Sequence, residues 1–184
     1  MRLTALSCYR LRTGLFAVFL TLAATQLLPG KAQAVDIATG IGAVEEGDDR
    51  GQAAAVVHVG FQNQWYSRFY VWGRSFGPVT ETNGILSVAK QTGVFGSKSM
   101  MASAGVSLMA NQTDITYKGY PEESSSYTNT NIGLLLGLRY DIITAKKFSL
   151  SASWDSHIFA AGDAVILLVT GRKQILGLTA GISL

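Results

Sequence analysis

Apolar and polar residues alternate along most of this chain, as they do in β-strands that have one apolar face. The clearest segment covers residues 131–142, where every second residue is apolar and Leu135 is the exception on the polar side. Successive side chains of a strand point to opposite sides, so such a segment separates an apolar face from a polar one. Residues 100–110, 148–160 and 174–184 alternate in the same way. The pattern predicts an all-β protein.

Eight such segments can be counted after residue 34. Their expected bounds are residues 35–44, 53–62, 64–76, 83–92, 99–115, 127–143, 148–160 and 174–184. The connections alternate between short ones, at Asn63 and residues 144–147, and long ones, at residues 45–52, 77–82, 116–126 and 161–173. Residues 93–98, on the side of the short turns, are the one exception, because they are too long for a tight turn. An even number of antiparallel strands with short turns at one end and long loops at the other is the layout of an up-and-down transmembrane β-barrel of the bacterial outer membrane.

The same alternation would fit a water-soluble barrel that holds a hydrophobic ligand. However, the polar faces are rich in Gly, Ser and Ala and poor in Lys and Glu, which suits the crowded interior of an eight-stranded barrel. Aromatic residues also lie near the expected strand ends, where membrane barrels have their girdles. They are Trp65, Tyr66, Trp72, Phe76, Tyr127, Tyr140, Phe148 and Phe159. We therefore expect the apolar faces to contact lipid, with a soluble periplasmic carrier as an alternative.

The first 34 residues have the pattern of a Sec-type signal peptide. Arg2, Arg10 and Arg12 precede an apolar stretch over residues 15–28, and Ala32-Gln33-Ala34 offers small residues at the cleavage positions. The apolar stretch is shorter than the roughly 18 residues that a transmembrane helix needs. We expect cleavage after Ala34, following export towards the outer membrane of a Gram-negative bacterium.

Cleavage would leave residues 35–184 as one β-barrel domain and would change its charge. The leader holds four of the 15 Lys and Arg residues and none of the 12 Asp and Glu residues, so 11 basic and 12 acidic residues remain. Nothing then indicates nucleic-acid binding, which needs a basic excess. The single cysteine, Cys8, lies in the leader ahead of the apolar stretch, so neither a lipid anchor nor a disulfide is indicated. No motif for a phosphate, a metal ion or a cofactor occurs, and we expect none to be bound.

Charged side chains occur on the polar faces that we expect to line the lumen. Charges away from water need partners, so we interpret these residues as a paired polar network that fills the barrel. Its members would be Arg68, Arg74, Arg139, Asp141, Asp155 and His157, with His58 as a further lumen residue. A catalytic alternative uses Ser153, His157 and Asp155, because a hydroxyl, a base and an orienting carboxylate share one strand face.

Two further segments stand out. Glu45, Glu46, Asp48 and Asp49 form an acidic run in the first expected external loop, which we interpret as solvated because it has no ligand spacing for a cation. A divalent cation near the lipopolysaccharide head groups is the alternative. Residues 164–170 are a continuous apolar run that could extend the last hairpin, dip into the outer leaflet, or pair with another protein by strand addition.

The layout of residues 35–184 resembles that of the small eight-stranded outer-membrane barrels. One subgroup, the barrel lipid A deacylases, carries on a late strand a His, a nucleophilic Ser two positions on, and then Asn-Ala-Gly. The similar stretch here is His157-Ile158-Phe159-Ala160-Ala161-Gly162. Phe159 stands where the Ser is needed and Ala160 where the Asn is needed. Because a phenyl ring cannot attack an ester, the resemblance does not imply deacylase chemistry.

We therefore expect a monomeric, non-enzymatic barrel with a packed lumen, because eight strands leave no open channel. Its partners would be outer-membrane lipid and lipopolysaccharide, and its external loops would mediate interactions at the envelope or the cell surface. The first alternative is a lipid A-modifying enzyme that resembles an acyl ester hydrolase. The second is the soluble periplasmic barrel that binds a hydrophobic ligand.

Overall fold

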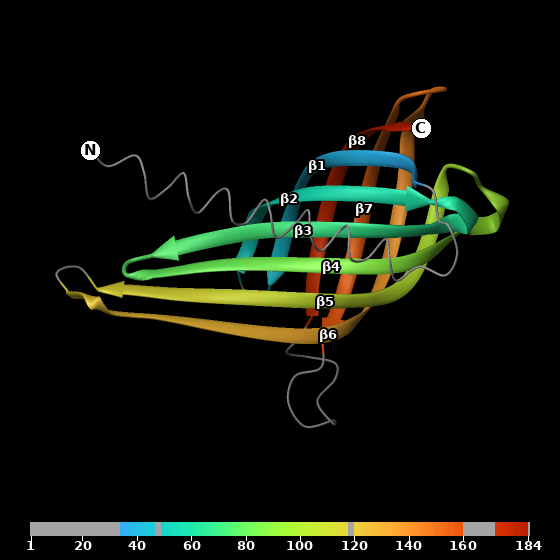
Figure 1. Ribbon diagram of the computed structural model, residues 1–184. Helices are drawn as coiled ribbons and strands as arrows, with labels where there is room; N and C mark the ends of the chain where they lie inside the picture. The colour runs from blue at the N-terminus through green and yellow to red at the C-terminus, as the bar shows by residue number, and fades with distance from the viewer. Residues whose placement is uncertain (1–33, 47–48, 118–119, 160–171, 184) are drawn as a thin grey trace.

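The protein folds as a closed antiparallel β-barrel in which strands that follow one another in the sequence are neighbours (Figure 1). This computed structural model describes residues 34–46, 49–117, 120–159 and 172–183, so the expected signal peptide up to residue 33 and residues 164–170 lie outside the described part. The eight strands are β1 (Ala34–Glu46), β2 (Asp49–Phe61), β3 (Trp65–Phe76), β4 (Val79–Gly93), β5 (Met100–Tyr117), β6 (Tyr120–Thr144), β7 (Ser149–Phe159) and β8 (Arg172–Ser183).

The barrel closes between the first and the last strand. β1 pairs with β8 from Asp36 opposite Ser183 to Glu46 opposite Lys173. The expected eight-stranded up-and-down barrel is therefore confirmed, and every pair of neighbours is antiparallel. In the described ranges, no helix is long and apolar enough to cross a membrane.

The apolar faces of the strands point out of the barrel. Ile132 and Leu134 on β6 are 71% and 59% exposed, whereas the next residue, Leu135, points inward and is 1% exposed. Leu176, Leu178 and Ile182 on β8 are exposed in the same way. The soluble alternative required these faces to line the interior, and the structure places them on the outside.

Small residues on the inner face let the strands come close together. A Cβ atom built on Gly40 would lie 1.9 Å from the carbonyl oxygen of Leu178 on the neighbouring strand. On β6, a Cβ on Gly137 would lie 2.4 Å from Oδ1 of Asp155. The glycines and serines of the polar faces thus leave room for the few large side chains inside, as expected for so narrow a barrel.

The strands extend further than the sequence predicted at the end away from the termini. The expected long loops at residues 45–52, 77–82 and 116–126 are mostly strand, and the β3–β4 turn consists only of Gly77 and Pro78. Gly77 has a φ of 58°, which glycine adopts at little cost. The polar residues in these segments have their backbone groups paired within hairpins, so they need no apolar face to form strands.

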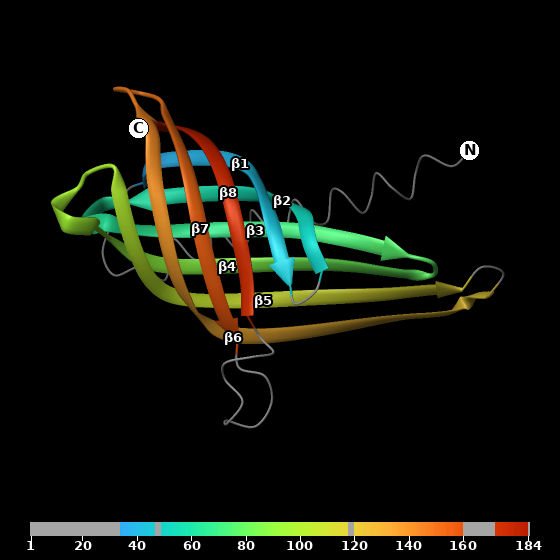
Figure 2. The same ribbon diagram turned by 180° about the vertical axis from the view of Figure 1, so that it is seen from behind.

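Four strands continue beyond the barrel wall, where they form a four-stranded extension of the sheet. The described pairing of β2 with β3 ends at Ala54 opposite Trp72, and that of β6 with β7 ends at Gly133 opposite Phe159. β3 to β6 remain paired with one another past these points, as Figures 1 and 2 show. We call this part the projecting sheet. It comprises residues 73–76 of β3, 79–82 of β4, 112–117 of β5 and 120–128 of β6.

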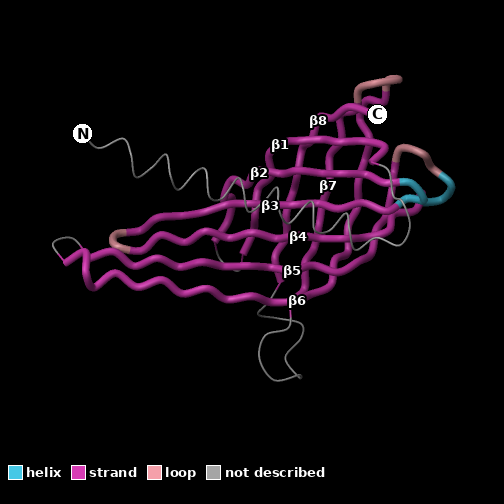
Figure 3. The backbone as a smooth tube through the Cα atoms, in the orientation of Figure 1, coloured by secondary structure: helices cyan, strands magenta, loops and turns pink. Residues whose placement is uncertain are grey.

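The opposite end of the barrel carries the short turns. Gln62–Gln64 joins β2 to β3, Val94–Gly96 begins the connection from β4 to β5, and residues 145–148 join β6 to β7. The N-terminus of β1 and the C-terminus of β8 pair with each other at this same end. The tube in Figure 3 shows the contrast between these compact turns and the long projecting hairpins.

Candidate functional site

A buried ion pair crosses the lumen between β3 and β7. The guanidinium of Arg68 donates to Oδ2 of Asp155, and the hydroxyl of Tyr70 donates to the same oxygen. Arg68 also donates to Nδ1 of His58 at 3.3 Å, and its guanidinium lies 4.9 Å from the ring centroid of Tyr66. Arg68 and Asp155 are both buried. Such charges are tolerated away from water only when they have good partners, and these two have them.

A second group of charges lies towards the end with the short turns. Arg139 donates to Oδ1 of Asp141 at 2.7 Å and lies 3.6 Å from Oδ2 of Asp36. Ser151 also donates to Asp141, at 2.7 Å. The Nε2 atom of His58 lies 3.0 Å from a guanidinium nitrogen of Arg139. Because Arg68 contacts the other ring nitrogen, His58 links the two groups of charges into one network.

The hydrogen-bond partner of His157 is not the one that the catalytic hypothesis requires. Its Nδ1 atom is hydrogen-bonded to Oγ of Ser107 at 2.9 Å, and Ser107 is 3.1 Å from Oγ of Ser87. The imidazole ring is fully buried and stacks on Phe159. Among the described residues, Oγ of Ser153 has no hydrogen-bond partner. The structure therefore does not assemble Ser153, His157 and Asp155 as a hydrogen-bonded triad.

Arg74 lies apart from the other expected members of the network. It follows Arg68 by six residues on β3, in the projecting sheet. There its Nε atom donates to Glu81 at 2.6 Å, and its guanidinium lies 5.4 Å from the ring centroid of Phe76. The structure thus brings Arg68 together with Asp155, and Arg139 with Asp141, while Arg74 belongs to the surface outside the barrel.

The acidic residues expected in an external loop are distributed over a strand hairpin. Glu45 is exposed on β1, and Glu46 and Asp49 are paired opposite each other where β1 and β2 end. Asp48 lies outside the described residues. Within the described ranges, no group of three or more His, Cys, Asp or Glu side chains could hold a metal ion.

Several members of the network were not singled out from the sequence. Tyr66 and Tyr70 flank Arg68 at a spacing of two, which indicates the inner face for both, although the sequence analysis assigned Tyr66 to an interface girdle. Asp36 and Ser107 come from strands far away in the sequence, and their contacts depend on how the barrel closes. No local signal could have identified those partners.

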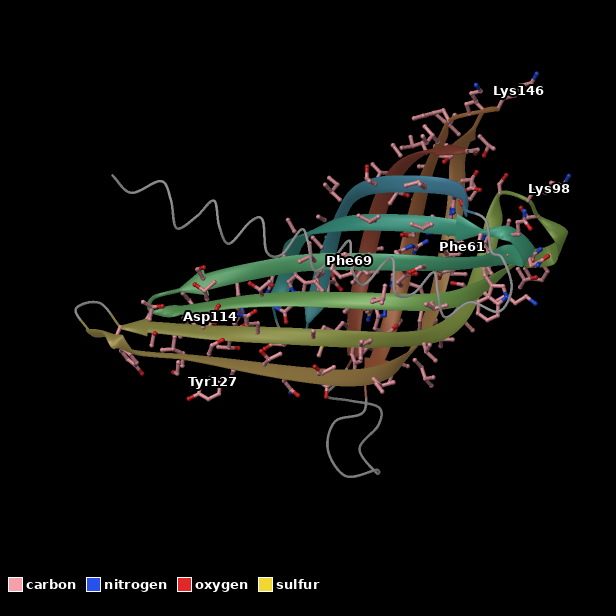
Figure 4. All side chains as sticks on the ribbon, in the orientation of Figure 1. Phe61, Phe69, Lys98, Asp114, Tyr127 and Lys146 are labelled. Carbon is pink, nitrogen blue, oxygen red and sulfur yellow. The ribbon has the colours of Figure 1, made fainter. Side chains whose placement is uncertain are left out.

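The projecting sheet presents polar and aromatic side chains. Nδ2 of Asn111 donates to Asn83 at 2.6 Å at its base, and Asn129 lies opposite Asn111 on the next strand. Tyr127 on β6 is 61% exposed, and Phe76 and Tyr117 are also exposed. Figure 4 shows Asp114 and Tyr127 in this part of the molecule, well away from the labelled lysines at the other end.

Comparisons with known proteins show the fold of this chain. No protein-family model matches it, and no curated protein matches its sequence. Several solved structures are similar to this chain, including the following two. The attachment invasion locus protein Ail of Yersinia pestis has 13% identity and a TM-score of 0.53, over 82% of this chain and 97% of Ail. Neisserial surface protein A has 13% identity and a TM-score of 0.51, over 83% of this chain and 99% of that protein. The chain has the fold of the small eight-stranded outer-membrane barrels.

Proposed function

We propose that this protein is a monomeric, non-enzymatic outer-membrane barrel that mediates attachment at the cell surface through its projecting sheet. The observation that carries the proposal is the sheet itself, in which four strands continue past the barrel wall. In outer-membrane barrels the short turns face the periplasm and the longer connections face outward. The projecting sheet would therefore stand outside the cell.

The interior supports a role outside the barrel. Eight strands leave room only for side chains, and the lumen here is crossed by the Arg68–Asp155 pair and filled by its partners. Such an interior offers no wide path for solutes. Ail is, by its name, an attachment protein. That role is transferred here as part of the proposal, because the likeness itself concerns the fold.

The lipid A-modifying alternative has less support from the geometry. A general base must reach the proton that it removes, and a nucleophile must be accessible to an ester. His157 is fully buried, and its Nδ1 atom already bonds Ser107, which is buried too. Lipid A mass spectrometry of cells with wild-type protein and with His157→Ala tests this alternative, and we expect identical acylation.

The orientation is tested first, with single-cysteine variants. The only cysteine of the chain lies in the expected signal peptide, so Thr128→Cys and Lys146→Cys would each give the exported protein one thiol. Both residues are exposed, one in the projecting sheet and one in the β6–β7 turn. We expect a membrane-impermeant maleimide to label residue 128 on intact cells, and residue 146 only after the outer membrane is permeabilised. The reverse pattern would contradict the proposed orientation.

Attachment is tested by shortening the projecting sheet while keeping the barrel. Removing residues 73–82 and 112–128, each replaced by a two-residue hairpin turn, cuts both hairpins at one level, because Gly73, Thr82, Gln112 and Thr128 share one row. Bacteria that express the shortened protein should adhere less to cultured epithelial cells than bacteria with the wild-type protein. The matched control is Lys146→Gln at the other end. Equal adhesion at equal surface amounts would contradict the proposal.

A further inference from the structure

The side chain of Phe95 is fully exposed at the tip of the β4–β5 turn. Its backbone has a φ of 51°, and the next residue, Gly96, has a φ of 76°. Bulky residues seldom adopt positive φ values, because Cβ then crowds the backbone. Both the exposure and the backbone conformation of Phe95 are unfavourable in water. A role outside the packing of the protein would account for a phenylalanine at this position.

The turn around Phe95 is held by its own hydrogen bonds. The backbone N–H of Ser97 donates to the carbonyl of Val94 at 2.9 Å, and Oγ of Ser97 accepts from the N–H groups of Ser99 and Met100, each at 3.1 Å. A Cβ atom on Gly93 would lie 2.4 Å from the carbonyl oxygen of Ser97, so the closure of the turn needs glycine there. These contacts hold the backbone of the turn that carries Phe95.

A second turn at the same end provides an internal comparison. In the β2–β3 turn, Asn63 and Gln64 have φ values of 61° and 67°, so two consecutive residues again have positive φ. Asn followed by Gly is the preferred pair for hairpin turns of this kind. The β2–β3 turn has Asn in the first position, whereas the β4–β5 turn has Phe95. Turn formation alone therefore does not explain the phenylalanine.

The end of the barrel that carries Phe95 has exposed positive charge. Lys98 in the same connection and Lys146 and Lys147 in the β6–β7 turn are all exposed, and Figure 4 shows Lys98 and Lys146 pointing away from the barrel. Asp36 and Asp141 are the described carboxylates near this end, and both face inward and pair with Arg139. Among described residues, the exposed charge of this end is therefore basic.

The height of the turn can be estimated from the lipid-facing residues of β4. Leu86 and Val88 are the outward apolar residues of this strand, so the middle of the apolar band lies near Ser87. Six residues of strand, at about 3.3 Å each and tilted by about 45°, place the end of β4 at Gly93 roughly 14 Å below that level, and Phe95 lies in the turn beyond it. The apolar band of such barrels is about 25 Å tall, so its edge is roughly 12 Å from the middle. Phe95 would then lie at the level of the lipid head groups.

We propose that the β4–β5 turn is a docking surface for anionic phospholipid in the periplasmic leaflet of the outer membrane. The ring of Phe95 lies among the head groups, and Lys98, Lys146 and Lys147 bind their phosphates. Aromatic rings and lysines are the side chains that favour this interface, and each basic residue near an anionic surface adds to the attraction. The inference rests on the membrane placement proposed above, and it adds a lipid class and the residues that recognise it.

The position of residue 95 is measured with a nitroxide on Phe95→Cys in phospholipid nanodiscs. Labels on Leu136→Cys, in the apolar band, and on Tyr127→Cys, in the projecting sheet, are the references. We expect the accessibility of residue 95 to a water-soluble nickel complex to lie between these two. A label at residue 95 as accessible as that at residue 127 would overturn the docking proposal. If the label at residue 136 were also water-accessible, the membrane placement itself would fail.

The lipid class is tested by unfolding in bilayers of phosphatidylcholine with and without phosphatidylglycerol. We expect phosphatidylglycerol to raise the unfolding temperature of the wild-type protein by several degrees, and to raise that of the Lys98→Gln, Lys146→Gln, Lys147→Gln triple variant by less than half as much. An equal rise would overturn the assignment of these lysines.

The ring is tested with Phe95→Asn, which favours the same backbone conformation. We expect this variant to have a lower unfolding temperature than the wild type in both bilayers. An unchanged or higher unfolding temperature would mean that the ring has no membrane role.

Discussion

At the residue scale, the Arg68–Asp155 pair has the largest expected effect on stability. Arg68→Ala would leave the carboxylate of Asp155 buried with only Tyr70 as a partner for Oδ2. Removing one member of a buried ion pair typically costs about 3–5 kcal/mol. We expect urea unfolding in lipid vesicles to show a loss of that size.

The double variant Arg68→Met, Asp155→Leu separates the cost of the lone charge from the value of the pair. Apolar replacements of similar volume are often neutral, so the double variant should recover most of the stability. Arg74→Ala is the matched control, because the Arg74–Glu81 pair lies in the partly exposed projecting sheet. It should cost less than about 1 kcal/mol. A double variant as unstable as Arg68→Ala would show that Asp155 does not depend on this arginine.

Gly137 is expected to be essential for the fit of the lumen. A methyl group at this position would lie 2.4 Å from Oδ1 of Asp155 and 2.6 Å from Oγ of Ser103. Overpacking of this kind typically costs about 1–3 kcal/mol, so Gly137→Ala should lower the free energy of unfolding by that amount. Gly84→Ala is the control, because its methyl group would meet Phe69 at 3.6 Å, an ordinary contact distance. Equal stability of the two variants would argue against a tightly packed lumen.

The sequence revealed which residues face inward but not which ones meet. Arg139, Asp141, Asp155 and His157 follow the period of two on their strands, and the structure places them inside. The partner of His157, by contrast, is Ser107, fifty residues away. That contact depends on the register of three strands, β5, β6 and β7, which no local pattern specifies. The catalytic hypothesis grouped Ser153 with His157 because they share one face of a strand. The hydrogen bond of His157 goes instead to Ser107 on β5.

At the element scale, β6 offers a direct test of which face meets lipid. Leu136 lies near the middle of the outward apolar residues of this strand and is exposed. Arginine at the bilayer midplane on the lipid face of a barrel costs about 2–4 kcal/mol. Leu136→Arg should therefore lower stability by this amount in vesicles, while Ser126→Arg on the same strand, in the projecting sheet, should have little effect. If both variants unfolded alike, the face that carries Leu136 would not be in contact with lipid.

The strands also explain why their ends were mispredicted. Alternation identified each strand where one face meets the lumen and the other is apolar, as in residues 132–142 of β6. In the projecting sheet apolar and polar residues do not alternate in this way, so residues 120–126 read as a loop although Tyr120, Ser125 and Ser126 pair with β5. Hairpin pairing satisfies their backbone groups without any apolar surface. The sequence therefore did not predict where a strand ends when that strand continues beyond the barrel wall.

At the scale of the whole molecule, closure of the barrel underlies the last prediction. β1 pairs with β8 along eleven consecutive positions, from residues 36 to 46, so the sheet has no free edge within the barrel wall. With backbone groups paired around the wall and the charges paired inside, unfolding must break many contacts together, and detergent alone does so slowly. We expect the protein from the outer-membrane fraction to migrate differently on a detergent gel when unboiled than when boiled.

The same gel tests whether the packed lumen contributes to the resistance to detergent, in addition to the closure of the barrel. Arg68→Ala should lose the unboiled band at a lower incubation temperature than the wild type, because the lone carboxylate of Asp155 weakens the interior across which β3 and β7 meet. Arg74→Ala should behave as the wild type does, since its pair lies beyond the wall. A wild-type protein in the soluble periplasm, with one mobility before and after boiling, would contradict the membrane barrel. The outward leucines would then require a protein or ligand cover.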